Sequence, residues 1–130
     1  MKKILIAGSS GHIGFFLHDK LINQYEIFSI NRQKSSEHRN IFNCDLTDKN
    51  KIENLVDKIP EFEILIFLVG LAHTKGKNKE IKMFKSINYN TLSNLVGALK
   101  KKSKMPDKII FASTISVYGE KLNIDVYNED

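Results

Sequence analysis

The chain has a single cysteine, Cys44, among its 130 residues, so an intramolecular disulfide is excluded. A lone thiol predicts a protein of a reducing compartment such as the cytoplasm. No apolar run approaches the length of a membrane span, and the run that follows Lys2 and Lys3 ends at Gly8, too early for a secretory signal. Internal repeats and low-complexity segments are also missing. The length suits one domain with its own hydrophobic core and is too short for two ordinary domains.

Positive charge exceeds negative charge, with a formal net charge of +5, but it is not concentrated in one stretch. The densest group, Lys100-Lys101-Lys102, ends an expected helix, where cations favour the helix dipole. The balance therefore predicts a solvated surface with some benefit for phosphate-bearing ligands. It predicts neither a nucleic-acid partner nor a membrane partner.

The most informative stretch is residues 1–16, where a strand, a glycine-rich turn and the start of a helix follow one another. Gly8 lets the chain turn sharply out of the strand. Gly11 has no side chain to keep a pyrophosphate away from the backbone, and Gly14 lets the new helix lie close to the sheet. Free N–H groups at the helix start would face the phosphates. We predict a dinucleotide site in this turn, with the contacting residues Gly8, Ser10, Gly11, His12, Ile13 and Gly14.

Strand and helix patterns alternate along the rest of the chain. Helices are expected over 15–23, 49–59 and 80–102, and strands over 25–30, 40–44, 62–69 and 108–113. Such alternation predicts an α/β fold of the Rossmann type, a doubly wound parallel sheet with strand order 3-2-1-4-5.

The end of the second strand bears on the choice of cofactor. It reads Asn31-Arg32 and carries no acid, whereas an acid there usually holds the ribose 2′-hydroxyl of NAD. Arg32 could pair with a 2′-phosphate, so the sequence leans towards NADP over NAD. Asn31, however, could also form a hydrogen bond with a ribose hydroxyl. Asp45, at the end of the third strand, could accept the adenine amino group or serve only as a turn residue. Either Thr47 or Asp48 is suited to cap the next helix.

Taken together, these motifs resemble the extended short-chain dehydrogenase/reductase family, and more narrowly its NAD(P)-dependent sugar-nucleotide epimerase/dehydratase branch. The glycine turn has that family's G-x-x-G-x-x-G spacing, and Asp45-Leu46 matches its adenine-binding pair. Leu68-Val69-Gly70 stands where the family usually has Leu-Ala-Ala. Asn88 matches the asparagine of the fourth helix, although Thr91-Leu92 replaces the Gly-Thr that usually follows. The segment 113–119 resembles Ser-Ser-x-x-Val-Tyr-Gly.

The resemblance implies roles for individual residues. Thr114 would be the catalytic Ser/Thr, hydrogen-bonded to the sugar oxygen during hydride transfer. Ile115 and Ser116 replace the Asp-Glu pair of the dehydratases, which disfavours dehydration and leaves epimerisation or carbonyl reduction of a nucleotide sugar. Outside the glycine turn, the implied cofactor-binding residues are Arg32, Asp45, Leu46, Leu68, Val69, Gly70, Asn88 and Ser113.

The family's tyrosine–lysine pair, Tyr-x-x-x-Lys, is absent from these 130 residues. We therefore expect residues 1–119 to form a NAD(P)-binding domain and residues 120–130 a polar tail leading towards a missing sugar-binding portion. Such a chain would lack catalytic competence by itself. The alternative is a stand-alone dinucleotide-binding module with a sensory or interaction role, or the product of a shortened gene. With no later strand to cover residues 108–113, we also expect self-association or a complementing C-terminal portion.

Overall fold

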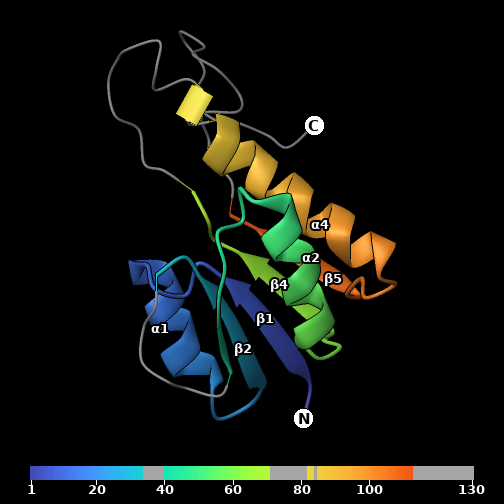
Figure 1. The fold of residues 1–130 in the computed structure, drawn as a ribbon. Helices are drawn as coiled ribbons and strands as arrows, with labels where there is room; N and C mark the ends of the chain where they lie inside the picture. The colour runs from blue at the N-terminus through green and yellow to red at the C-terminus, as the bar shows by residue number, and fades with distance from the viewer. Residues whose placement is uncertain (34–39, 71–81, 84, 113–130) are drawn as a thin grey trace, which may run out of the picture.

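Five parallel strands form a single sheet in the computed structural model, which describes residues 1–33, 40–70, 82–83 and 85–112 (Figure 1). Their order is β3-β2-β1-β4-β5, which confirms the predicted topology. The strands are β1 (Lys3–Ala7), β2 (Glu26–Asn31), β3 (Ile41–Asn43), β4 (Ile64–Phe67) and β5 (Lys108–Phe111).

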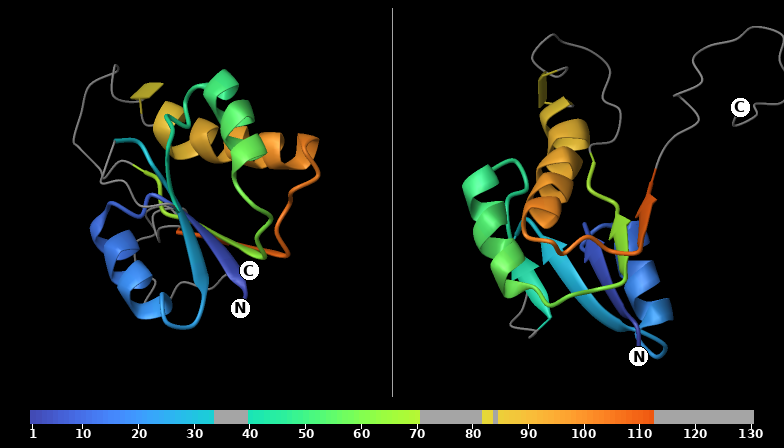
Figure 2. Two further views of the ribbon diagram at one scale, coloured as in Figure 1. Left: turned by 60° about the horizontal axis from the view of Figure 1, so that its bottom comes forward. Right: turned by 90° about the vertical axis from the view of Figure 1, so that its right-hand side faces the viewer.

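Helices cover both faces of this sheet, as expected of a doubly wound fold. One face carries α1 (His12–Leu21), and the other carries α2 (Lys49–Lys58) and α4 (Thr91–Lys101), as Figure 2 shows. A short π-helix, η1 (Lys85–Asn90), leads directly into α4. None of the helices in the described part of the chain has the length and apolar character that crossing a bilayer requires.

The central strand β1 divides the core between the two faces. Its alternate residues Leu5 and Ala7 belong to the large cluster beneath α2 and α4, in which Leu95 and Leu99 of α4 are also fully buried. Ile4 and Ile6 belong to a smaller cluster, against which Leu17 of α1 packs. Both faces of β1 are thus covered, in keeping with its continuously apolar sequence.

Some element boundaries differ from the sequence-based expectation. Helix α1 begins at His12, three positions before the expected Phe15, because Gly11 is extended (φ −76°, ψ 171°) and acts as its N-cap. Strand β4 ends at Phe67, two residues before the expected Val69, because its partner β1 ends at Ala7 and leaves nothing to pair with further residues. The expected helix 80–102 is helical over nearly all of its described residues and ends at Lys101, but residues 85–90 form the π-helix η1.

Strand β5 lies at one edge of the sheet and pairs only with β4 among the described strands. All four of its residues are exposed, including Ile110 and Phe111, each 47% exposed. The expected edge position is therefore confirmed. The Ser113 that was expected to end this strand lies outside the described residues.

Candidate functional site

A half-open cavity of about 570 Å³ lies at the carboxyl ends of the strands, where parallel α/β sheets bind their ligands. Segments that follow β1, β2, β3 and β4 form one part of its wall, and the region of η1 and the start of α4 form the other. The cavity is lined by Gly8, Ser10, Gly11, Ile30, Arg32, Cys44, Asp45, Leu46, Thr47, Leu68, Val69, Gly70, Lys82, Met83, Ser86, Ile87 and Thr91.

Most of the residues expected to bind a cofactor gather around this cavity. Those on its wall are Gly8, Ser10, Gly11, Arg32, Asp45, Leu46, Leu68, Val69 and Gly70. His12, Ile13 and Gly14 form the first turn of α1, next to Gly11 but outside the lining. Asn88 lies in η1 near Gly70, since a Cβ built on Gly70 would be 3.1 Å from the Asn88 Oδ1. Ser113 and the expected catalytic Thr114 lie outside the described residues.

Gly8 makes the turn out of β1 that brings the chain to the cavity. Its φ of +90° is a conformation that side chains rarely adopt, and its N–H donates to the Ile30 carbonyl oxygen at 2.9 Å. A Cβ at this position would also lie 3.1 Å from the backbone of Leu68 and Val69. Glycine is therefore required both by the backbone conformation and by the close approach of the segment after β4.

Gly14 and Gly11 differ in what surrounds them. A Cβ on Gly14 would lie 2.5 Å from the Gly8 carbonyl oxygen and from the Ser9 Cα, so α1 packs directly on the turn. The sequence predicted close packing on the sheet, but the close contact is with the turn that precedes the helix. A Cβ on Gly11 would meet only the Gly8 oxygen, at 3.7 Å. The space beside Gly11 is thus open towards the cavity that it lines.

No side chain caps the start of α1. The first amides of a helix need acceptors from outside the helix, and the positive end of its dipole favours an anion. With Gly8, Ser10 and Gly11 on the cavity wall, this turn has the features of a phosphate-binding turn.

Asn31, at the end of β2, is hydrogen-bonded to the turn between β1 and α1 without lining the cavity. Its Oδ1 accepts hydrogen bonds from the Ser9 hydroxyl at 3.0 Å and from the Ser10 N–H at 3.1 Å. The side chain is buried, and the residue is outside the cavity lining, whereas its neighbour Arg32 is exposed and lines the cavity. Nothing in the local sequence indicated this contact, because Ser9 and Asn31 are separated by 22 positions.

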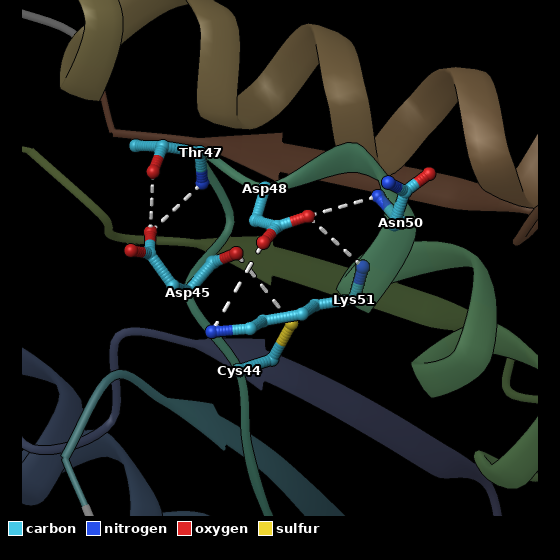
Figure 3. Close-up of polar contacts among 6 residues, drawn as sticks. All are labelled: Cys44, Asp45, Thr47, Asp48, Asn50 and Lys51. Atoms are coloured by element: carbon cyan, nitrogen blue, oxygen red, sulfur yellow. Dashed lines mark hydrogen bonds and ion pairs between the residues drawn. The ribbon is translucent and has the colours of Figure 1, made fainter.

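Two carboxylates, Asp45 on the cavity wall and Asp48 just beyond it, organise the segment after β3 (Figure 3). The Oδ1 of Asp45 accepts from the Thr47 hydroxyl at 2.7 Å and from the Thr47 N–H at 3.0 Å. These bonds lower the pKa of Asp45, with smaller contributions from the charges of Arg32 and Lys51. Asp45 thus stays ionised on the cavity wall. Asp48, rather than Thr47, caps α2, because its side chain accepts from the Asn50 and Lys51 N–H groups.

Cys44, the sole cysteine, is buried at the base of this wall. Burial raises the pKa of its thiol, and the nearby charges of Asp45 and Asp48 raise it further. The thiol is therefore kept neutral, and it donates a hydrogen bond to the Asp45 carbonyl oxygen at 3.7 Å (Figure 3). From the sequence, Cys44 indicated only a reducing compartment and not a place on the cavity wall.

Of the residues in η1 and α4, only Asn88 was expected at the site, and it lies near Gly70 but outside the cavity lining. Ser86, Ile87 and Thr91 line the cavity, and the Thr91 hydroxyl donates to the Ile87 carbonyl oxygen. The Asn94 side chain donates to the Leu46 carbonyl oxygen at 3.0 Å and so joins α4 to the wall after β3. The π-helical register changes which side chains face the cavity, so spacing for a regular α-helix does not identify them.

Comparison with solved structures finds the same fold in several proteins. UDP-glucose 4-epimerase from Thermus thermophilus, solved in complex with NAD, is 21% identical with a TM-score of 0.79, over 98% of this chain and 42% of that one. A short chain dehydrogenase family protein from Francisella tularensis is 20% identical with a TM-score of 0.74, over 95% of this chain and 55% of that one. Uronate dehydrogenase from Agrobacterium tumefaciens, also solved with NAD, is 23% identical with a TM-score of 0.67, over 88% of this chain and 41% of that one.

This chain therefore spans about half the length of these neighbours, or less, and at such identities the likeness concerns the fold. No curated protein sequence gives a significant match. The model of the NAD dependent epimerase/dehydratase family, by contrast, matches residues 4–130. That match takes in the glycine turn, the cavity walls and nearly all of the sequence, and it shows that the chain belongs to the NAD dependent epimerase/dehydratase family.

Proposed function

We propose that this chain binds NAD or NADP in the cavity at the carboxyl ends of its strands, as the nucleotide-binding part of an epimerase or reductase that acts on nucleotide sugars. One observation carries the proposal: the start of α1, without a side-chain cap, opens through Gly11 onto a cavity whose walls also hold Arg32 and Asp45. The family match and the two neighbours solved with NAD support it.

The residues present fit a dinucleotide. The turn from Gly8 to Gly11 would hold the pyrophosphate with its backbone amides, and Asp45 with Leu46 would hold the adenine. Leu68, Val69 and Gly70 would lie along the nicotinamide half, where Asn88 is also close to Gly70. The bound cofactor would supply the hydride acceptor and donor of the reaction.

We propose NADP as the preferred cofactor because of the charge on the cavity wall beside β2. Arg32 lies there, exposed to an incoming ligand, and could pair with a 2′-phosphate. The preceding residue, Asn31, is neutral, so no carboxylate of this strand end would repel that phosphate. The negative charge of Asp45 on the same wall works against this preference, because it interacts with the positive charge of Arg32.

For the reaction, we propose Thr114 as the hydroxyl that bonds the sugar oxygen, and we expect this chain alone to lack turnover. The tyrosine–lysine pair that would serve as the family's base is absent from its 130 residues. General acid–base catalysis contributes about 10²–10⁴-fold, so a missing base alone would reduce turnover severely. Robust conversion of a UDP- or dTDP-hexose by the purified chain, persisting in Thr114→Ala, would refute this assignment.

Calorimetric titration with NAD and NADP tests the cofactor site. Gly11→Val should abolish detectable binding of both cofactors, because a Cβ there has room in the free protein and its branches would occupy the space of the pyrophosphate. Gly97→Val is the matched control, since Gly97 lies on α4 with nothing within 4 Å of a built Cβ. Equal binding by wild type and Gly11→Val would overturn the site.

Arg32→Ala should reduce the NADP/NAD affinity ratio, and an unchanged ratio would refute the NADP preference.

We further propose that β5 makes the isolated chain self-associate, or bind a complementing C-terminal portion. The strand has an unpaired edge among the described elements, and Ile109, Ile110 and Phe111 are exposed on it. Light scattering over a concentration series should show growing mass for the wild type and less for Ile110→Lys. A monodisperse wild-type monomer at high concentration would contradict the proposal.

With one cysteine and a reducing compartment expected, we propose a cytoplasmic protein.

A further inference from the structure

We propose that Asn31 is a positioning residue for the dinucleotide site, acting through the phosphate turn rather than by touching the ribose. This inference rests on the proposed function, because it assigns a role to a residue behind the turn from Gly8 to Gly11. Asn31 would hold the turn in the shape that binds the pyrophosphate. Its substitution should therefore affect ligand affinity in a different way from the substitution of a residue that contacts the ligand.

The side chain of Asn31 faces away from the cavity. Side chains alternate between the two faces of a strand, and the flanking residues Ile30 and Arg32 both line the cavity while Asn31 does not. Asn31 is only 4% exposed. A ligand in the cavity would therefore meet the side chains of Ile30 and Arg32 before it could reach that of Asn31.

The amide oxygen of Asn31 is already fully used. A carbonyl oxygen accepts two hydrogen bonds, and this one receives the Ser9 hydroxyl at 3.0 Å and the Ser10 N–H at 3.1 Å. No lone pair remains for a ribose hydroxyl. Both donors belong to the turn, and Ser9 is itself buried, so loss of the acceptor would leave a buried hydroxyl and a backbone N–H without it.

Asn31 also joins the turn to the segment of the cavity wall that follows β3. Its backbone carbonyl oxygen accepts from the Cys44 N–H at 3.0 Å, at the start of the wall that carries Asp45. The preceding residue, Ile30, accepts from the Gly8 N–H at 2.9 Å. The end of β2 thus connects the expected pyrophosphate end of the cavity with its expected adenine end, and the Asn31 side chain holds Ser9 and Ser10 in register with that frame.

Titration with ADP and with 2′-deoxy-ADP separates positioning from contact. We expect Asn31→Ala to weaken ADP binding about tenfold or more, in keeping with the loss of two hydrogen bonds that shape the turn. The ratio of ADP to 2′-deoxy-ADP affinity should stay at its wild-type value, because the 2′-hydroxyl meets the same groups in both proteins. Asn43→Ala is the matched control: Asn43 pairs with Asn31 across β2 and β3, is exposed, and should bind ADP as wild type does.

Two further readouts keep the test decisive if Asn31→Ala folds poorly. Ser9→Ala removes one of the two donors and should weaken ADP binding by a smaller factor, about threefold to tenfold, again with an unchanged ADP/2′-deoxy-ADP ratio. Hydrogen exchange of the Ser10 amide, measured without ligand, should accelerate in Asn31→Ala and not in Asn43→Ala.

The outcomes are distinguishable. If Asn31→Ala binds ADP and 2′-deoxy-ADP equally well while the wild type prefers ADP, then Asn31 contacts the ribose and the inference is wrong. Wild-type ADP affinity in both Asn31→Ala and Ser9→Ala would overturn it as well, while leaving the proposed function intact. Failure of the wild type to bind ADP, NAD and NADP would overturn the proposed function, and the inference with it.

Discussion

The helices α1 and α2 both begin just beyond a parallel strand, yet their first backbone amides meet different surroundings. At the start of α2, the side chain of Asp48 accepts from the N–H groups of Asn50 and Lys51. At the start of α1, Gly11 stands in the equivalent N-cap position and offers no side chain. One helix start is capped by its own chain, and the other is left open beside the cavity.

The difference separates stability from binding. A side-chain cap typically contributes about 1 kcal/mol relative to alanine and only about a few tenths relative to glycine, so α1, with Gly11 as its N-cap, forgoes little stability compared with α2. The open start of α1 can instead satisfy its amides with an anion, whose charge its dipole favours. Packing compensates around α1, since Gly14 lies against Gly8 and Ser9, and Asn31 holds Ser9 and Ser10. In this chain the missing cap of α1 is thus an indication of a binding site. Placing a capping side chain at Gly11 should therefore make the start of α1 resemble that of α2.

The largest effect is expected from giving α1 the cap that α2 has. Gly11→Asp should lower the affinity for NAD and NADP at least about a hundredfold, equal to about 2.7 kcal/mol, because its carboxylate would occupy the phosphate position and repel the phosphates. Stability should be unchanged or rise by up to about 1 kcal/mol, since the carboxylate can accept from the helix amides. Calorimetry and urea unfolding measure the two quantities. Retained binding would show that the phosphates lie elsewhere, and Gly97→Asp controls for added charge.

The next effect concerns the close packing of α1 on its turn. Gly14→Ala should lower the free energy of unfolding by about 1–3 kcal/mol, because the new Cβ would lie 2.5 Å from backbone atoms that must move. Gly97→Ala, in the open surface of α4, should instead raise it by about 0.5–1 kcal/mol. Urea unfolding compares the two variants. If both glycines respond alike, then packing on the turn does not explain why Gly14 is needed.

Removal of the α2 cap should affect stability alone. Asp48→Ala should lower the free energy of unfolding by about 1 kcal/mol, because two backbone N–H groups lose their acceptor. Asp48→Asn retains a side-chain oxygen and should lose much less. Affinity for NAD and NADP should match wild type in both variants. A clear loss of affinity would mean that the start of α2 also takes part in binding.

The smallest effect is expected at Asp45, whose pKa depends on its hydrogen bonds from Thr47. Thr47→Val removes the hydroxyl bond that lowers the pKa of Asp45 most, so this pKa should rise towards its ordinary value, while the bond from the Thr47 N–H remains. A carboxyl whose pKa is lowered by folding stabilises the protein above its unfolded pKa, and loses this contribution as the pH falls through the folded pKa. The variant should therefore lose less stability to acid in that window. Carboxyl NMR titration measures the pKa, and an unshifted Asp45 would contradict the assignment.

Much of the architecture could be predicted because its determinants are local. The apolar run of β1, the φ requirement of Gly8 and the capping chemistry of Asp48 each depend on residues close by in the chain. Alternating strands and helices then allow few connections, so the strand order also followed from the sequence. Boundaries were less exact where a partner decides them, as at Phe67, where β4 ends because β1 has ended.

The sequence by itself determined which residues could bind a dinucleotide, and only the tertiary structure decided what each of them faces. The sequence predicted that Gly14 lets the helix lie close to the sheet, but the structure packs it against Gly8 and Ser9 of the turn. The sequence left open what the Asn31 side chain faces, and the structure places its oxygen on Ser9 and Ser10. The Asn94–Leu46 bond joins residues 48 positions apart and could not be seen locally. Chain propensities act over a few neighbours, whereas a side chain's partners are set by which distant segments the sheet brings together.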